Sequence, residues 1–302
     1  MSRAFPRALF GGLAAALLAT PAARAQTPIA GHYPPGQSGI RGASSPAPGW
    51  MYTNFSRFFS NLEVKDAAGG TSDDVGELRY ANISMFTWTT SWKVLSMRYG
   101  ALAGIPFSTG NLTPSSADAG SSSFGLGDVL VTPISLYGVS PAWDYQLQFT
   151  VWSASGRFSP GGTSNRGNGC WALVYSVGGV AYPGGKRDDW SLSAVARIEQ
   201  NFEQRDSGIE PGDDIVVDWG VGKVVPAGSR SAEIGVSGFG TWQITEQNGG
   251  GDPGPYQYFG LGPEGSLGVT DAVTLRLRLQ WEFAARNTVQ GNNVWFIANF
   301  KI

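Results

Sequence analysis

Polar residues, three of them ionisable, recur at every second position of the segment 272–283, which reads AVTLRLRLQWEF. Arg276, Arg278 and Glu282 alternate with leucines and aromatic residues, and side chains at alternate positions of a β-strand point to the same face. The segment is therefore predicted to be a strand with one apolar face and one charged face. Charged groups that share an enclosed interior either pair with one another or line a water-filled path that selects solutes by charge and size.

The same alternation in other segments predicts further charged side chains on the inner face. With those of 272–283, the candidate lining residues are Arg98, Asp144, Arg197, Glu199, Asp214, Asp218, Glu233, Arg276, Arg278 and Glu282. Their mixed signs argue against strong selectivity for anions or cations. The simpler alternative for any one of them is a structural ion pair that fills a closed interior.

Other chemistry finds little support in the composition. The chain has one His, His32, and one Cys, Cys170, so it offers no His/Cys set for zinc or haem, and no cofactor is predicted. A hydrolase using His32 would need a nucleophile at a recognisable spacing, and none is found. The acid pairs 73–74, 188–189 and 213–214 are open to Ca²⁺ binding or to simple solvation. Asn54, Asn82 and Asn111 begin sequons that match the glycosylation pattern only formally, because the first two fall in predicted strands.

The first 25 residues have the pattern of a secretory signal peptide. Arg3 and Arg7 precede the apolar run 8–20, and Ala-Arg-Ala at 23–25 forms a small-x-small cleavage site before Gln26. No later apolar run approaches the roughly 20 residues of a membrane helix. The net charge of −2, with basic residues scattered singly, argues against nucleic acid as a partner. The single Cys excludes an intramolecular disulfide.

About twelve strand-like runs follow residue 50, and none of the chain has a sustained helical period. They lie near 50–60, 79–89, 93–105, 125–138, 142–154, 170–182, 189–202, 214–226, 231–245, 256–269, 272–285 and 294–302. Long connectors (61–78, 106–124, 155–169, 203–213, 246–255 and 286–293) alternate with short turns. This asymmetry, with apolar-out and polar-in alternation, is typical of an antiparallel up-and-down β-barrel of the bacterial outer membrane. Soluble barrels and sandwiches have the opposite arrangement of faces and remain the alternative.

Residues 26–49 are rich in Pro, Gly, Ser and Ala and predict an irregular segment ahead of the barrel (50–302). Because it precedes the first strand, this segment, with His32 and Tyr33, is a candidate plug that enters the lumen from the periplasmic side. Both ends of the mature chain are expected in the periplasm. Loops 61–78 and 106–124 are expected to gather ligand outside the cell.

Several short motifs resemble the phenol meta-pathway degradation (SphA-like) family of outer-membrane transporters. They are HYPPG at 32–36, PAPGWMY at 46–52, GLGD at 125–128, WQITE at 242–246, GLGPEG at 260–265 and FAARN at 283–287. The resemblance extends over nearly all of the mature chain. It implies a β-barrel that admits small hydrophobic or aromatic compounds.

The sequence thus predicts a passive outer-membrane channel for small hydrophobic or aromatic compounds. Its expected partners are outer-membrane lipid, the small ligand and, during biogenesis, the barrel-assembly machinery. Two alternatives remain open: an enzyme acting on membrane lipid through His32, and a structural barrel that displays its loops.

Overall fold

The computed structural model describes residues 29–110, 112, 124–162, 165–251 and 254–302. The predicted signal peptide lies outside these residues. Thirteen strands are formed: β1 (Gly49–Lys65), β2 (Thr71–Val94), β3 (Met97–Ser108), β4 (Gly125–Leu126), β5 (Leu130–Val139), β6 (Trp143–Trp152), β7 (Ala172–Ala181), β8 (Trp190–Asn201), β9 (Asp214–Ala227), β10 (Arg230–Gln243), β11 (Gln257–Gly268), β12 (Val273–Arg286) and β13 (Thr288–Lys301). A short 3₁₀ turn spans Pro183–Gly185.

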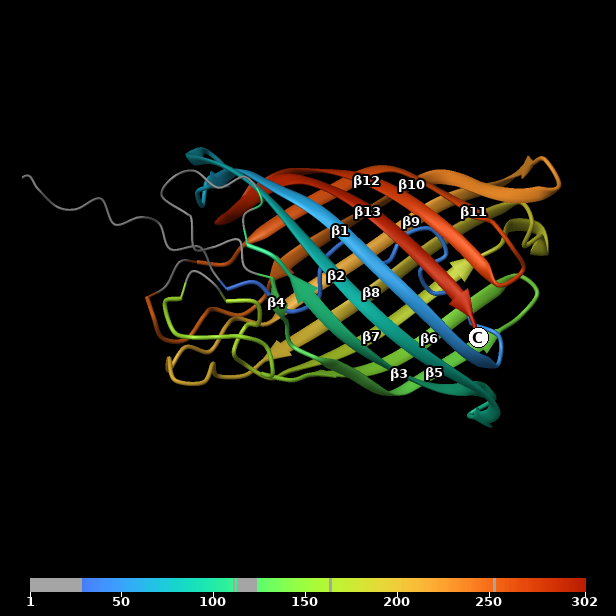
Figure 1. The fold of residues 1–302 in the computed structure, drawn as a ribbon, viewed down its shortest axis with the longest axis horizontal. Helices are drawn as coiled ribbons and strands as arrows, with labels where there is room; N and C mark the ends of the chain where they lie inside the picture. Colours follow the sequence, from blue (N-terminus) through green and yellow to red (C-terminus); the bar gives the residue numbers. More distant parts are fainter. Residues whose placement is uncertain (1–28, 111, 113–123, 163–164, 252–253) are drawn as a thin grey trace, which may run out of the picture.

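The strands form one closed sheet (Figure 1). From β5 to β13 each strand pairs with the next in the chain, β13 pairs with β1, and β2 pairs with both β1 and β3. β4 is a two-residue ladder on β3, so twelve long strands make the wall. All pairings are antiparallel, which confirms the predicted up-and-down barrel of about twelve strands. None of the helical turns in the described residues is long and apolar enough to cross a membrane.

Alternate side chains of each strand face either lipid or the lumen. In β12, Leu277 and Trp281 are 44% and 53% exposed on the outside, whereas Arg278 between them is fully buried. Closure leaves no free sheet edge, so every main-chain N–H and C=O at membrane depth can be paired in the wall. An apolar exterior and a charged interior then match lipid and water respectively.

We expect Leu277→Arg to lower the free energy of unfolding by about 2–4 kcal/mol, because the guanidinium would face the middle of the bilayer. Urea unfolding in lipid vesicles, followed by tryptophan fluorescence, measures this cost. Leu267→Arg is the control, since Leu267 is equally exposed but lies near the short turn after β11, where charge costs about 0–1 kcal/mol. Equal, negligible costs at both positions would contradict the membrane-facing assignment of β12.

Two of the expected long loops are instead strands. Residues 61–78 continue β1 and β2 to a tight turn at 66–70, and residues 286–293 belong to β12 and β13, with Asn287 in the turn. The polar residues here led to the loop prediction. This part of the sheet extends beyond the lipid, so its outer surface meets water and needs no apolar side chains. Polar residues can therefore continue the strands, as in the cross-strand pair Asn61 and Glu77. Residues 61–78 therefore form a β-hairpin and not the long loop that the sequence predicted.

Residues 29–48, here called the lumen segment, run through the inside of the barrel. Its first residues contact the long-loop end, where Ile29 N–H donates to Gln247 and Asn168 donates to the Ala30 carbonyl. Its last residue precedes Gly49, which pairs with Thr89 beside the short turns, at the same end as Ile302 (Figure 1). The expectation that both chain ends lie on the short-turn side is therefore wrong for the described start of the chain. The lumen segment runs from the long-loop end at Ile29 to the short-turn end, where β1 begins.

Candidate functional site: the barrel lumen

Carboxylates of the wall accept the main-chain N–H groups of the lumen segment. Glu199 of β8 accepts from His32 (2.5 Å) and Tyr33 (3.0 Å). Asp218 of β9 accepts from Gly36 (2.9 Å) and Ser38 (3.1 Å), and Glu264 of β11 accepts from Ile40 (3.2 Å). A segment rich in Pro and Gly forms no helix or sheet of its own, so its buried amides need such side-chain acceptors.

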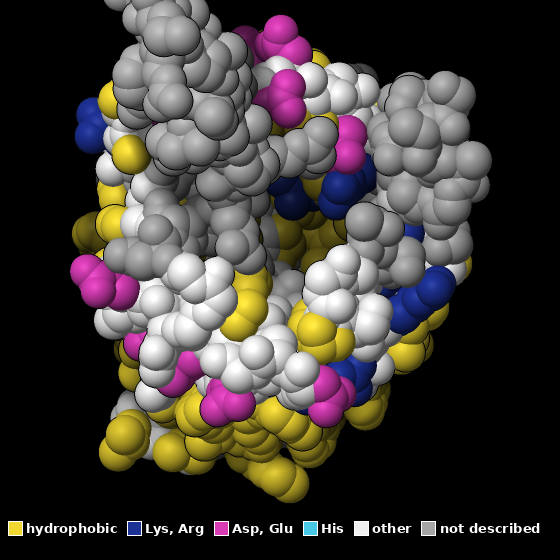
Figure 2. Space-filling view, turned by 90° about the vertical axis from the view of Figure 1, so that its left-hand side faces the viewer, with side chains coloured by type: hydrophobic (Ala, Val, Ile, Leu, Met, Phe, Trp, Pro, Cys, Tyr) yellow, Lys and Arg dark blue, Asp and Glu magenta, His cyan; other side chains and the backbone are white. Residues whose placement is uncertain are grey.

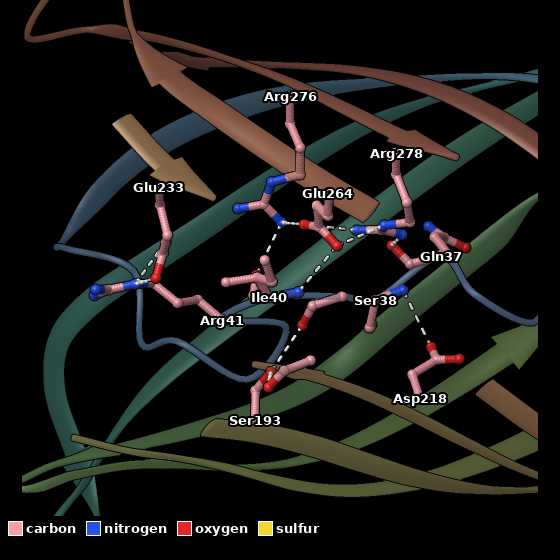
Figure 3. A network of polar contacts seen from close by, with 12 residues as sticks. Gln37, Ser38, Ile40, Arg41, Ser193, Asp218, Glu233, Glu264, Arg276 and Arg278 are labelled. Atoms are coloured by element: carbon pink, nitrogen blue, oxygen red, sulfur yellow. Dashed lines mark hydrogen bonds and ion pairs between the residues drawn. The ribbon is translucent and has the colours of Figure 1, made fainter. Parts of the chain in front are cut away.

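Arginines and a serine bind the carbonyl groups of the same segment (Figure 3). Arg278 donates to the carbonyls of Gly36 and Gln37, the latter at 3.0 Å, and Arg276 donates to that of Ile40 at 3.0 Å. Ser193 donates to the Gly39 carbonyl at 2.9 Å. Arg278 also pairs with Glu264 at 2.7 Å, and both side chains are almost fully buried. The acids and arginines of β8–β12 therefore bind one continuous stretch of backbone.

Glycines make this close contact possible. A Cβ at Gly39 would overlap Glu264 and Arg278, and a Cβ at Gly220 of β9 would lie 2.5 Å from the Ile40 nitrogen. Glycine is used where another chain must approach the backbone closely. Gly39 and Gly220 thus leave the room in which the lumen segment lies against the wall.

His32 lies at the long-loop end between two carboxylates. Its Nδ1 is 2.9 Å from Glu199, its Nε2 is 3.3 Å from Asp128, and its ring stacks on Trp152 at 5.5 Å. Burial alone would lower the pKa of His32, but the hydrogen bonds and charges of Asp128 and Glu199 raise it to about 9. Both ring nitrogens therefore face carboxylates, which makes His32 an anchor of the segment and unsuited to activating a hydroxyl or thiol.

Release of the lumen segment is expected to increase as the pH rises from about 6.5 to 9. The pKa of His32 is raised in the folded state, so its contribution is complete below its ordinary pKa of 6.5 and is lost as the pH passes about 9. The shift corresponds to roughly 3 kcal/mol, with Asp128, Glu199 and the neighbouring Asp214 as the facing acids. Labelling of Ala43→Cys by a maleimide measures release, because Ala43 is fully buried while the segment is bound. In His32→Gln this pH dependence should disappear; if it persists unchanged, His32 is not the titrating anchor.

Tyr33 joins the segment to β8 and β9. Its hydroxyl donates to Asp218 at 2.5 Å, and the Arg197 guanidinium lies 4.0 Å from its ring centroid. Arg197 pairs with Asp218 at 3.0 Å. Burial and the charge of Asp218 raise the pKa of Tyr33 well above its ordinary value, so the phenol stays a hydrogen-bond donor.

All ten candidate lining residues lie on the inner face, and most of them contact the lumen segment. Arg98 donates to Ser45 at 2.9 Å, and Glu233 accepts from Arg41 at 2.8 Å. Asp214 lies beside Gly31, where a Cβ would be 2.6 Å from its Oδ2. Two residues bind the wall instead. Asp144 pairs with Arg187 and Tyr182, and Glu282 accepts from Asn293 and from Gly291 N–H.

Arg57, Asp128 and Glu264 are inward charges that are not among the ten predicted lining residues. Arg57 shares one face of β1 with Met51, Thr53 and Phe55, which line the cavity, so the period-2 pattern contained the signal. Glu264 alternates with Leu261 and Pro263 but was obscured by glycines. Asp128 stands outside a strand and accepts from the N–H groups of Gly156 and Asn168, contacts that only the tertiary structure reveals.

A cavity of about 340 Å³ remains between the lumen segment and the opposite wall. Its apolar lining includes Met51, Phe55, Met85, Leu102, Trp152 and Ile297, and its neutral polar lining includes Thr53, Thr87, Thr132, Gln146, Gln148 and Asn299. Three arginines (Arg41, Arg197 and Arg276) lie on its segment side, whereas the acids of that side bind the segment. Figure 2 shows the long-loop end, where the surface is hollowed and basic and hydrophobic side chains line the hollow.

The other candidate groups take no part in this cavity. Cys170 is buried, and burial together with Asp128 and Glu199 raises the pKa of its thiol to about 12. Asp73 and Asp74 are exposed on β2, and Asp213 accepts from Asn201 N–H. In the part of the chain that the structure describes, no three His, Cys, Asp or Glu residues are grouped as metal ligands.

The closed antiparallel wall, apolar outside and polar inside, defines an outer-membrane β-barrel. The chain belongs to the family described as "Putative MetA-pathway of phenol degradation", whose model matches residues 63–297. This finding confirms the resemblance seen in the sequence. A search of curated proteins found no match.

Solved structures support the fold. The COG4313 outer-membrane channel from Pseudomonas putida F1 is 14% identical, with a TM-score of 0.71 over 89% of this chain and all of that one. The β domain of the Bordetella autotransporter BrkA is 10% identical, with a TM-score of 0.50 over 85% of this chain and all of that one. The Pseudomonas putida toluene transporter TodX also matches, at 8% identity and a TM-score of 0.38 over 84% of this chain and 90% of that one.

Proposed function

We propose that this barrel is a passive channel for small aromatic or hydrophobic compounds that carry a polar group, and that it is not an enzyme. The main support for this proposal is the cavity beside the lumen segment. At about 340 Å³ it falls in the usual range of small-molecule pockets. Its methionine, phenylalanine and tryptophan side chains suit a ring, and its arginines, threonines and glutamines suit a polar or anionic substituent. Membership of a family named for phenol degradation agrees with this class of compound.

We further propose that the lumen segment restricts passage. The segment fills the side of the lumen next to β8–β12. The path that remains open for solutes runs along β1–β3 and β5–β7. In this proposal residues 1–25 are removed on export, the barrel-assembly machinery inserts the chain, and lipid covers its apolar face. In this proposal eight of the ten lining residues act mainly by holding the segment, Asp144 and Glu282 brace the wall, and Arg197 and Arg276 also face the solute.

Uptake of benzoate and phenol into proteoliposomes tests the channel function. Thr87 of β2 lines the cavity, whereas its neighbour Phe86 faces lipid. We expect Thr87→Trp to slow uptake several-fold by filling the path, and the matched Phe86→Trp to leave it unchanged. A wild-type barrel that is tight to both solutes and electrically silent would contradict the proposal.

A further inference from the structure

The lipid-facing side of β1 and β2 carries a group of uncharged polar residues. Asn54 and Ser56 of β1 lie beside Ser84 and Asn82 of β2. They share their face with Phe58 and Phe86, which are 37% and 45% exposed, while the alternate residues, such as Thr53 and Met85, line the lumen cavity. The four residues, here called the polar floor, therefore face outward on the two strands that cross the front of Figure 1.

The outward rows of other strands have a different composition. They are Trp143, Tyr145 and Leu147 in β6, Leu192, Ala194, Ala196 and Ile198 in β8, and Leu275, Leu277, Leu279 and Trp281 in β12. Such rows match an outer wall that contacts hydrocarbon. The polar floor departs from this rule, and the channel proposed for the lumen gives it no role.

The polar floor lies at membrane depth. Trp50 and Trp88 stack at the short-turn end, where aromatic residues mark the membrane interface. Asn54 is four positions further along β1. A strand tilted by about 45° rises roughly 2.4 Å per residue along the barrel axis, which places Asn54 about 10 Å inside an apolar band about 25 Å tall. The amides are therefore surrounded by hydrocarbon and are not at the lipid headgroups.

The side chains of the polar floor bond to one another. The Asn54 and Asn82 amides donate reciprocally at 3.2 and 3.0 Å, and Ser56 donates to Asn54 at 3.1 Å. Tyr52 OH lies 3.1 Å from Ser84 Oγ, and Tyr80 OH lies 3.2 Å from Ser56 Oγ. These bonds lower the cost of placing amides in lipid. Ser56 also accepts from the Asn82 amide at 3.0 Å, and Ser84 from the Asn54 amide at 3.5 Å, so the bonds of both serines are complete. The Tyr52 and Tyr80 hydroxyls, which donate to these serines, can each accept a further hydrogen bond.

Aromatic rings stand on both sides of the polar floor along the strands. On the short-turn side, Tyr52 packs on Phe86 and Phe300 with centroids at 5.0 and 5.8 Å. On the long-loop side, Phe58 packs on Tyr80 and Phe296 at 4.9 and 6.4 Å. The short Asn and Ser side chains are thus recessed between two raised groups of rings. A surface hollow opens at the outer of these groups, lined by Ser56, Phe58, Tyr80, Thr109, Leu112 and Phe296.

We propose that this recess is a binding site for one aromatic ring bearing a hydroxyl group, which enters from the membrane. The rings on either side offer offset or edge-to-face packing, and the Tyr52 or Tyr80 hydroxyl accepts the ligand's hydrogen bond. A lipid acyl chain fills the recess without using these acceptors. A second copy of the barrel is a poor occupant of the recess. When two such faces approach each other, their projecting aromatic rings would collide before the two polar floors came into contact. The choice of ligand class rests on the proposed function, whereas the position of the site does not.

The probe pair 4-fluorophenol and 4-fluorotoluene tests this site, because the two differ in the hydroxyl group. We expect saturable ¹⁹F shifts for 4-fluorophenol with the protein in phosphatidylcholine nanodiscs, beyond those of empty discs, and none for 4-fluorotoluene. A spin label on the lipid acyl chains should broaden the bound signal, which a ligand in the lumen would escape. In Tyr52→Phe/Tyr80→Phe, which removes the accepting hydroxyls and keeps both rings, we expect about tenfold weaker binding, as for the loss of a hydrogen bond.

Tyr145→Phe is the control, since it removes a hydroxyl from the lipid face of β6 and should leave binding unchanged. Equal binding of both probes, or unchanged binding in the double variant, would overturn the site. If the wild type is a dimer in nanodiscs and the double variant a monomer, the recess is a subunit interface and the proposal is wrong. Proteoliposome uptake is a separate measurement. A wild-type barrel that takes up no solute would refute the proposed channel, whereas the ¹⁹F experiment alone decides this site.

Discussion

Deletion of residues 31–44 is expected to raise the single-channel conductance several-fold and to make it steadier. The removed stretch occupies the β8–β12 side of the lumen, where Glu199, Asp218 and Glu264 accept its amides. Water would replace it along the whole wall, because these carboxylates and the arginines beside them are readily hydrated. The remaining residues before Gly49 keep the start of β1 intact. Planar-bilayer recordings of the purified barrel measure the change.

A point variant separates blockage from any effect of deletion on folding. Gly39→Val keeps the length of the segment, but its side chain overlaps Glu264 and Arg278 and should displace the segment. Its conductance should rise towards that of the deletion. Gly268→Val is the control, since a Cβ there meets nothing within 4 Å. If both the deletion and Gly39→Val conduct like the wild type, the segment does not restrict the lumen.

Glu264→Gln is expected to destabilise the folded barrel by about 3–5 kcal/mol, because it leaves two guanidiniums without their shared carboxylate. Glu264 lies 2.7 Å from Arg278 and 3.2 Å from Arg276, and it also accepts from Ile40 N–H. The Arg278 and Glu264 side chains are 0% and 1% exposed, so little water reaches the site. Urea unfolding in lipid vesicles gives the free energy.

The same substitution in the deletion background shows whether burial causes the cost. Once the segment is absent, water can solvate Arg276 and Arg278, and the loss should fall to about 1 kcal/mol or less, as for exposed ion pairs. The difference between the two backgrounds is the coupling energy between segment and wall. Equal costs in both would mean that the segment neither dehydrates this ion pair nor depends on it.

The sequence alone determined the strand framework and the faces of the wall. In 272–283 the period of two places Leu277 and Arg278 on opposite faces whatever the neighbouring strands are, because strand geometry is local. The charged inner face and the apolar outer face then require lipid outside and polar contents inside. The strand ends at 61–65 and 71–78 were not predictable in this way, since polar residues above the membrane form strands or loops with similar ease.

Only the tertiary structure decided what fills the lumen. Glu199, Asp218 and Glu264 lie on three strands far apart in the chain, and their common role follows from one irregular segment that passes all of them. A segment without periodicity carries no signal for its path, because its hydrogen bonds are made to side chains and not to a regular ladder. The polar floor was hidden for a related reason. Unlike 272–283, β1 mixes polar and apolar residues on both faces, so its alternation did not show that the face of Asn54 meets lipid, and the closed sheet decided it.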